Sequence, residues 1–318
     1  MGGLTTLNEW LSWQENLHSQ EIDLGLARIQ RVYAKLFSNG VPFTTITVAG
    51  TNGKGSTIAF IESIYQQTDF SVAKFTSPHI LDYNERFVIN DVQATDKQIC
   101  SAFEQIEQVR GDTSLTYFEF STLAALLIFA EQGVDIAILE IGLGGRLDSV
   151  NVVDSDVTVI TNIAIDHVDY LGDTRELIGH EKAGIMRTNI PCVCGDTNPP
   201  LSLQKHADDI NALLEFVSKP YSGELSLKGD HQRTNAALAV LCVKKLDQKF
   251  KLDKHSIQQG LASAQLEGRF QIKNINGKQF IFDVAHNEAA VKVLAKELAK
   301  DKQPTLAVFS ALKDKNIP

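Results

Sequence analysis

The spacing of apolar residues along the chain predicts strands that alternate with helices. Residues 43–49 form an apolar, β-branched run typical of a buried strand, and the helical pattern of residues 56–67 follows a glycine-rich turn. The same criteria predict strands at residues 71–75, 134–140, 156–161 and 192–194, and helices at residues 24–37, 116–131, 174–186, 231–246 and 286–300. This alternation favours an α/β fold, in which a mostly parallel sheet has helices on both faces.

The pattern of elements changes near residues 266–269, where we expect a domain boundary. The long α/β block before it gives a first domain of residues 1–267. The elements predicted after it are a hairpin of residues 270–275 and 279–283 around Asn276-Gly277, a helix at residues 286–300 and a strand at residues 305–309. About 50 residues are too few for a complete α/β domain. We therefore expect residues 268–318 to be the start of a second domain that is incomplete in this chain.

The composition is that of a globular protein and excludes several classes of function. Of the 318 residues, 43% are hydrophobic and 22% are charged, which excludes disorder over the whole chain. A net charge of −9 argues against a broad basic surface, so we expect no nucleic-acid partner. No apolar run reaches the ~18–20 residues of a membrane span. Trp10, Glu15 and His18 interrupt the region where a signal peptide needs an apolar run, so we expect a cytoplasmic protein.

The cysteines indicate a reducing compartment and no metal site. Their positions are 100, 192, 194 and 242, which is too scattered for a disulfide framework. Cys192-Val193-Cys194 is weak evidence for a metal site, because no second pair of cysteines or histidines accompanies it.

A glycine-rich turn between the first predicted strand and its helix is a candidate phosphate site. The turn contains Thr51-Asn52-Gly53-Lys54-Gly55-Ser56. Glycines let backbone N–H groups approach phosphate oxygens, the helix N-terminus adds partial positive charge, and Lys54 adds a full charge. The spacing departs from G-x-x-x-x-G-K-[ST], because Val48 stands where the first glycine would be. A plain tight turn is the alternative, but the strand, helix and lysine together favour a bound nucleotide.

Further polar residues follow the predicted strands, at the sheet edge where α/β proteins bind ligands. Glu140 ends an apolar strand, which puts a charge at the rim of the core, and a solvated acid is the alternative. His167 follows Asp166 beyond the next strand, and a histidine taken by itself at such a position is more often structural than a metal ligand. Asn235 lies one helical turn after His231, so one helix face can offer its amide to adenine, and a polar helix start is the alternative.

A series of motifs, in order, resembles the folylpolyglutamate synthase/dihydrofolate synthase family of the Mur ligase superfamily, and its bacterial bifunctional branch in particular. The resemblance covers about residues 10–316. The motifs are Gly50-Thr51-Asn52-Gly53-Lys54-Gly55-Ser56, Thr76-Ser77-Pro78-His79, Asn84-Glu85-Arg86, Thr116-Tyr117-Phe118-Glu119-Phe120, Glu140-Ile141-Gly142-Leu143-Gly144-Gly145-Arg146-Leu147-Asp148, Asp166-His167, Glu181-Lys182-Ala183-Gly184-Ile185, His231-Gln232, Asn235-Ala236-Ala237, Gly268-Arg269-Phe270 and Asp283-Val284-Ala285-His286-Asn287.

The resemblance implies an ATP-dependent ligase that adds L-glutamate to dihydropteroate or a (tetrahydro)folate through an acyl phosphate, giving ADP and phosphate. It also implies a smaller, Rossmann-like α/β second domain, with ATP and Mg²⁺ as cofactors. By resemblance, Ser77, Glu140 and His167 bind the metal, and Lys182 is carbamylated by CO₂. Carbamylation needs a neutral amine, so we expect the site to lower the pKa of Lys182. Without the family, Lys182 is an ordinary solvated lysine and Ser77 a turn residue.

The resemblance also assigns the remaining site residues. It gives the catalytic residues as Lys54, Lys182 and His286, and the ATP-binding residues as Thr51, Asn52, Gly53, Lys54, Gly55, Ser56, Gln232, Asn235, Arg269 and Asp283. The pteridine-binding residues are Ile22, Asp23, Leu24, Thr116, Phe118, Leu147 and Asp148. Binding residues on both sides of the domain boundary imply that domain closure assembles the site. The alternatives are a core position for Phe118 and a structural role for His286 at a helix start.

One departure and three rival functions stay open at this stage. Val284 stands where the family has glycine, which is compatible only if the backbone there avoids positive φ. The rivals are another amino-acid ligase of the Mur superfamily, a P-loop kinase, and a non-catalytic nucleotide-binding fragment. We expect small-molecule substrates and a monomer. The sequence leaves open whether both synthase activities are present, which folate form is preferred and how many glutamates are added.

Overall fold

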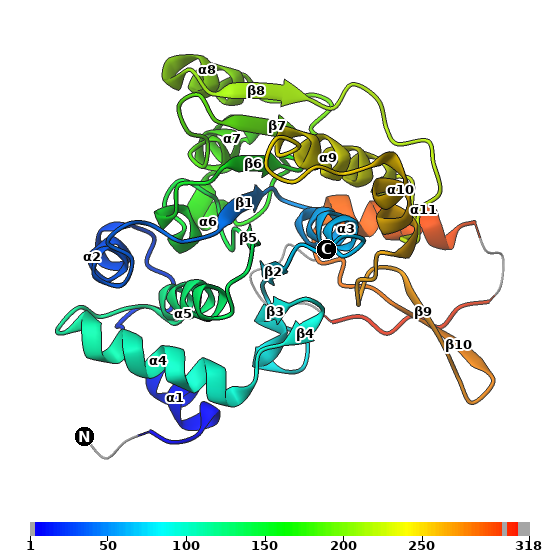
Figure 1. Cartoon of the computed structure of the whole chain (residues 1–318). Helices are drawn as coiled ribbons and strands as arrows, with labels where there is room; N and C mark the ends of the chain where they lie inside the picture. The colour runs from blue at the N-terminus through cyan, green and yellow to red at the C-terminus, as the bar shows by residue number, and fades with distance from the viewer. Residues whose placement is uncertain (1–3, 301–303, 311–318) are drawn as a thin grey trace.

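The computed structural model, which describes residues 4–300 and 304–310, contains one large sheet and one hairpin within those residues (Figure 1). The strands of the large sheet are β1 (Thr44–Ala49), β2 (Val72–Phe75), β3 (Phe87–Ile89), β4 (Val92–Gln93), β5 (Ile136–Glu140), β6 (Val157–Ile160), β7 (Pro191–Cys194) and β8 (Leu213–Phe216). Their order is β4-β3-β2-β5-β1-β6-β7-β8. The pairs from β2 to β8 are parallel, and β3 pairs antiparallel with β2 and β4, which confirms the mostly parallel sheet.

Both faces of this sheet are buried in apolar cores. Ile46 of β1 pairs with Ile138 of β5 and Val157 of β6, and all three side chains belong to the same core. Ala137 and Leu139, the neighbours of Ile138 along β5, belong to the other core. Because successive residues of a strand point to opposite faces, a strand that is apolar throughout must be covered on both sides.

Helices supply the two covering layers (Figure 1). One face is covered by α3 (Lys54–Tyr65), α9 (Gln232–Lys245) and α10 (Lys254–Ser263). The other face is covered by α1 (Leu7–Gln14), α2 (Ala27–Leu36), α4 (Asp96–Arg110), α5 (Tyr117–Glu131), α7 (Arg175–Ala183) and α8 (Leu201–Ile210). The helix α5 lies beneath α1, α2 and α4, so it is buried on nearly all sides and its sequence is apolar all round.

The sequence pattern identified the elements of the sheet core better than those at its periphery. The helices α2, α3, α5, α7, α9 and α11 (Glu288–Leu298) match predicted segments, with ends that differ by a few residues. The pattern did not reveal α1, α4, α8, α10, β3, β4 or β8. In α8, only Leu203 and Ala207 are buried, so the apolar face is too narrow to give a clear helical period.

The segment after residue 267 confirms one prediction and contradicts another. The strands β9 (Gln271–Ile275) and β10 (Lys278–Phe282) form the predicted hairpin, with positive φ at Asn276 and Gly277. The strand predicted at residues 305–309 is wrong, since residues 304–310 contain no strand. Leu306 and Val308 are more than nine-tenths exposed. No described strand lies beside them to share the backbone hydrogen bonds that a strand needs.

The helices of the described residues are short or polar compared with a membrane-spanning helix. None of them is both long enough and apolar enough to cross a membrane.

Candidate active site

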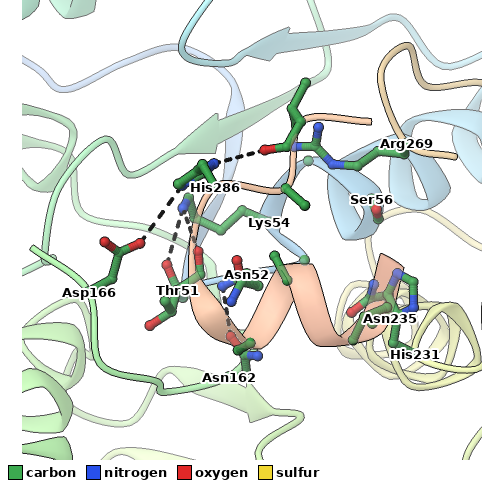
Figure 2. Close-up of a pocket in the computed structure, with 18 of the residues that line it drawn as sticks. Thr51, Asn52, Lys54, Ser56, Asn162, Asp166, His231, Asn235, Arg269 and His286 are labelled. Atoms are coloured by element: carbon green, nitrogen blue, oxygen red, sulfur yellow. Dashed lines mark hydrogen bonds and ion pairs between the residues drawn. The ribbon is translucent and has the colours of Figure 1, made fainter. Parts of the chain in front are cut away.

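A cavity of about 300 Å³ opens beyond the C-terminal ends of β1, β5 and β6. Segments that are far apart in the sequence meet there (Figure 2): the turn after β1, the end of β5, the segment after β6, the start of α9 and the segment before α11. Of the expected residues, the lining includes Thr51, Asn52, Gly53, Lys54, Gly55, Ser56, Ser77, Glu140, His167, Lys182, Gln232, Asn235, Arg269, Asp283 and His286. This is the sheet edge at which parallel α/β folds bind ligands.

Two glycines shape the turn between β1 and α3. Gly53 precedes α3 in the left-handed conformation, with φ of 87°, which glycine adopts without strain. A Cβ atom at Gly53 would lie 2.7 Å from Asn235 Oδ1, and one at Gly50 would lie 1.8 Å from Thr161 Oγ1. The turn therefore requires glycine at both positions because its neighbours approach so closely.

Hydrogen bonds hold this turn against the segment after β6. Thr51 N donates to Asn162 O at 2.9 Å, and Asn52 N donates to Asn162 Oδ1 at 2.8 Å. Lys54 Nζ folds back to Gly50 O at 3.1 Å. The first backbone N–H groups of a helix lack intrahelical partners, so the start of α3 and the ammonium of Lys54 together offer a site for an anion.

The carboxylate of Glu140 at the end of β5 lies opposite Lys54. Its Oε1 is 4.0 Å from Lys54 Nζ, and its Oε2 accepts a hydrogen bond from Ser77 N at 3.0 Å. The side chain is only 7% exposed, and this burial raises the pKa of Glu140, while the charge of Lys54 acts in the opposite direction. A buried carboxylate is costly unless a positive charge compensates it, so this position favours a cation.

His167 completes the set expected to bind a metal. It precedes the short helix α6 (Val168–Leu171), with a backbone φ of 51°. The backbone N–H of His167 donates a hydrogen bond to Asp166 Oδ1 at 2.9 Å. Within residues 4–300 and 304–310, no group of three His, Cys, Asp or Glu side chains could hold a metal ion. Ser77, Glu140 and His167 do line the same cavity, and Mg²⁺ needs few protein ligands because it keeps several waters and takes other ligands from a phosphate.

Lys182 is a buried amine that borders the same cavity from α7. The residue is 3% exposed. Burial first, and then the charge of Lys54, lower the pKa of Lys182 to about 7 against the opposing effect of Asp166 and Asp148. The glycine-rich segment after β5 allows this close packing, because a Cβ atom at Gly145 would lie 3.1 Å from Lys182 Cα. The lowered pKa agrees with the expectation from the sequence.

The start of α9 and one side of α11 form two further walls of the cavity. Gln232 Nε2 donates to Ser56 Oγ at 3.1 Å, and Asn235 Nδ2 donates to Gln232 Oε1 at 2.9 Å. The apolar residues that line the cavity from α11 are Ala289, Ala290, Val293 and Leu294. An amide-bearing wall together with an apolar wall suits a flat heterocycle with a hydrogen-bonding edge.

Three of the expected site residues line the cavity from the part of the chain after residue 267. The carboxylate of Asp283 fixes the backbone there, since Oδ2 accepts from Phe270 N at 2.9 Å and Oδ1 from Ala285 N at 2.8 Å. Partial burial lowers the pKa of Arg269. His286 Nε2 lies 3.8 Å from Asp166 Oδ2 (Figure 2). Val284 avoids positive φ, so valine fits at the position where glycine was expected.

The residues expected to bind the pteridine are not part of the cavity lining. They are Ile22, Asp23, Leu24, Thr116, Phe118, Leu147 and Asp148. Asp148 Oδ2 accepts a hydrogen bond from the cavity residue Leu143 at 2.8 Å, and burial raises the pKa of Asp148 to about 6. A Cβ atom at Gly142, which also lines the cavity, would lie 2.8 Å from the Phe118 ring.

Sequence reasoning missed the apolar residues of α11, and it also missed two polar cavity residues outside that helix and one interaction. Asn162 and Lys228 line the cavity. Asn162 follows β6 by two residues, so the argument that identified Glu140 at a strand end also applies to it. Lys228 lies in an irregular segment and no pattern marks it. Asn287 Nδ2 donates to Asn52 Oδ1 at 3.0 Å and to Asp166 Oδ2 at 3.1 Å, which brings the start of α11 against the phosphate turn.

Comparisons with known proteins identify close relatives. A model of the Mur ligase middle domain matches residues 48–191. The dihydrofolate synthase/folylpolyglutamate synthase of Escherichia coli (strain K12) is 40% identical over an alignment of 334 positions, which covers 98% of this chain and 77% of that protein. The structure of E. coli FolC in complex with DHPP and ADP has a TM-score of 0.88 and 38% identity, covering 95% of this chain and 76% of that one. A bifunctional folylpolyglutamate synthase/dihydrofolate synthase structure with Mn, AMPPNP and L-glutamate bound has a TM-score of 0.84 and 39% identity, covering 93% and 75%.

Proposed function

The chain belongs to the dihydrofolate synthase/folylpolyglutamate synthase family, and from this premise we propose that the cavity described above is its ATP-binding and ligation site. The protein is an ATP-dependent ligase that joins L-glutamate to a pteridine carboxylate and releases ADP and phosphate. The observation that carries the site assignment is the lining itself. One cavity brings together the phosphate turn, the buried acid Glu140, the buried amine Lys182 and the side chains of Arg269 and His286.

The reaction sets three physical tasks for this site. A carboxylate is a poor acyl donor because it would have to expel oxide. Transfer of the γ-phosphoryl group of ATP converts it to an acyl phosphate, from which the glutamate amine displaces phosphate. The enzyme must therefore hold the reactants in line, neutralise charge on the transferred group, and keep water away from the acyl phosphate.

In this proposal the turn after β1 binds the phosphates of ATP. The backbone N–H groups of residues 51–56 and the ammonium of Lys54 would contact the phosphate oxygens, with Thr51, Asn52, Gly53, Gly55 and Ser56 shaping the turn. Lys54 now folds back to Gly50 O, so a phosphate would replace a weak internal acceptor. Gln232 and Asn235 would face the adenine, and the apolar side of α11 would cover its ring.

Ser77, Glu140 and His167 would hold the divalent cation that the reaction uses. When bound, Mg²⁺ offsets the negative charge of the phosphates and so favours attack by the substrate carboxylate. The neutral amine of Lys182 is suited to take up CO₂, which would turn a buried cation into an anion near this set. Support for that role comes from the lowered pKa of Lys182 and its place in the lining.

Residues after position 267 would close the site from a second domain, with residues 1–267 forming the first. Arg269 and Asp283 would contact ATP from that side, and His286 would act beside Asp166. The pteridine would bind next to the cavity, against Ile22, Asp23, Leu24, Thr116, Phe118, Leu147 and Asp148. We also propose a monomer, because the phosphate turn, the buried acid and the buried amine that ligation needs all lie in this one chain, and a cytoplasmic location, where ATP is available.

The test is ADP release by the purified protein with each substrate omitted in turn. ADP formation must depend on L-glutamate together with dihydropteroate or tetrahydrofolate, and comparing the two pteridines identifies which synthase activity is present. ATP hydrolysis that is indifferent to both glutamate and pteridine would contradict the proposal. A kinase product, phosphorylated but without glutamate, would contradict it as well.

A further inference from the structure

An ionic network built on Arg28 connects two segments of the proposed pteridine site. Arg28 lies in the first turn of α2. Its Nη1 donates to Asp23 Oδ2 at 2.5 Å and its Nη2 to Asp23 O at 2.5 Å. On the other side its Nε donates to Glu119 Oε2 at 3.3 Å, and Nη2 is 3.3 Å from Glu119 Oε1. All three guanidinium nitrogens are therefore engaged by two acids that are almost a hundred residues apart.

Each of the two acids controls one wall of that site. Asp23 lies between Ile22 and Leu24 in the loop before α2, so both its side chain and its backbone are held by Arg28. Glu119 and Thr116 form a reciprocal cap at the start of α5: Thr116 N donates to Glu119 Oε2 at 2.8 Å, and Glu119 N donates to Thr116 Oγ1 at 3.2 Å. Moving Glu119 would therefore move the cap that orients Thr116.

The burial of Glu119 makes this connection sensitive to Arg28. The side chain of Glu119 is 4% exposed and that of Arg28 is 22% exposed, so water and salt screen the pair little. Glu119 Oε1 accepts no hydrogen bond within the described residues, and the charge of Arg28 is what compensates it. A buried carboxylate without its cation is strongly unfavourable, so loss of Arg28 would force the Glu119 side chain to rotate away from its present position.

A second group holds Asp23 but does not reach Glu119. His18 Nε2 lies 3.0 Å from Asp23 Oδ2, and His18 Nδ1 lies 3.0 Å from Ser114 Oγ. His18 therefore connects Asp23 to the segment just before α5, whereas Arg28 connects Asp23 to Glu119 within α5 itself. A planar guanidinium can donate hydrogen bonds to both carboxylates at once because its N–H groups point in fixed, diverging directions. The ammonium of a lysine, on a flexible chain, cannot reproduce this forked geometry.

We propose that Arg28 is a positioning residue for the pteridine substrate, which sets the distance between the loop around Asp23 and the start of α5 at Thr116. Arg28 itself does not line the cavity assigned to ligation. The inference rests on the proposed function, because it takes the residues around Asp23 and Thr116 as the pteridine site. It assigns Arg28 to recognition of one substrate only, since none of its contacts reaches the ATP cavity.

The experiment compares Arg28→Ala and Arg28→Lys with Arg31→Ala, a matched control. Arg31 lies on the same helix, is exposed and forms no ion pair with the described residues. For each protein we would measure KM for dihydropteroate and for ATP, the dissociation constant for dihydropteroate by calorimetry, and the thermal unfolding midpoint. Both Arg28 variants should raise KM and the dissociation constant for dihydropteroate at least tenfold, with KM for ATP within twofold of the starting value. Arg31→Ala should change neither.

The outcomes separate this inference from the proposed function. Unchanged dihydropteroate binding in both Arg28 variants would overturn the inference and leave the function intact. If KM for dihydropteroate and KM for ATP rise together, in step with a fall in the thermal unfolding midpoint, the inference would also be overturned. Arg28 would then stabilise the fold in general and not position the pteridine in particular. Restoration of normal KM by Arg28→Lys would show that charge alone suffices and would contradict the role of the fork. If the unaltered protein neither binds dihydropteroate nor ligates glutamate, the proposed function itself fails.

Discussion

Replacing Lys182 with methionine should stabilise the ligand-free protein while it abolishes ligation. The pKa of this lysine falls from an ordinary value of 10.5 to about 7 in the folded protein. Between these two values the unfolded chain binds a proton that the folded chain does not, so stability rises with pH across this window. Below pH 7 the folded protein must carry a buried ammonium, and the full free-energy cost of burying that charge then lowers its stability. A shift of this size corresponds to about 5 kcal/mol at low pH, at ~1.4 kcal/mol for each pH unit.

Methionine keeps most of the volume of lysine but carries no charge. We expect Lys182→Met to raise the free energy of unfolding by about 2–4 kcal/mol at pH 6, the remainder being offset by lost contacts, and by progressively less as the pH approaches 10. Urea denaturation at pH 6, 7.5 and 9 in CO₂-free buffer measures this difference. Lys205→Met, at an exposed position on α8, is the matched control and should change stability little at any pH. A Lys182→Met protein that is less stable at pH 6, or whose gain does not depend on pH, would refute the reasoning.

The state of Lys182 should also determine whether the enzyme is active. If the neutral amine takes up CO₂, the unaltered enzyme should lose ADP formation in CO₂-free buffer and recover it when bicarbonate is added. Lys182→Met should stay inactive at every bicarbonate concentration, because it has no amine to modify. Full activity of the unaltered enzyme without CO₂ would exclude carbamylation, although the stability prediction would still stand.

The other predictions concern the phosphates, the cation and the adenine. Lys54→Ala and Glu140→Ala should each lower kcat for glutamate-dependent ADP formation at least a hundredfold. Lys54→Ala removes the charge at the phosphate turn, and Glu140→Ala removes the buried carboxylate proposed to bind the cation. Full activity in either variant would overturn these roles. Removing divalent cations with EDTA should abolish the reaction and added Mg²⁺ should restore it, and activity that persists in EDTA would contradict a metal role for Ser77 and His167. Asn235→Ala should raise KM for ATP about tenfold and leave KM for glutamate unchanged, whereas the reverse pattern would place glutamate at that wall.

The local pattern was sufficient for the central sheet and the phosphate turn. Apart from Glu140, β1, β5 and β6 contain only apolar residues and threonines, all of them buried, and this composition marks them without any knowledge of their neighbours. The glycines and Lys54 form a continuous segment, so their chemistry is visible in the order of the residues. The strand predicted at residues 305–309 shows the limit of this approach, since an apolar run becomes a strand only where another strand pairs with it.

The sequence by itself determined which residues carry charge, which segments are apolar, and that glycines precede a helix beside Lys54. Only the tertiary structure decided that Glu140 lies opposite Lys54, that Lys182 is buried, and that Arg28 joins Asp23 to Glu119. The physical reason is that the burial of a side chain and the distance between two charges depend on how distant segments pack together. A lysine is an ordinary solvated cation until other segments exclude water from it. Parallel pairing of β1, β5 and β6 brings their distant C-terminal ends to one edge, and that placement creates the site.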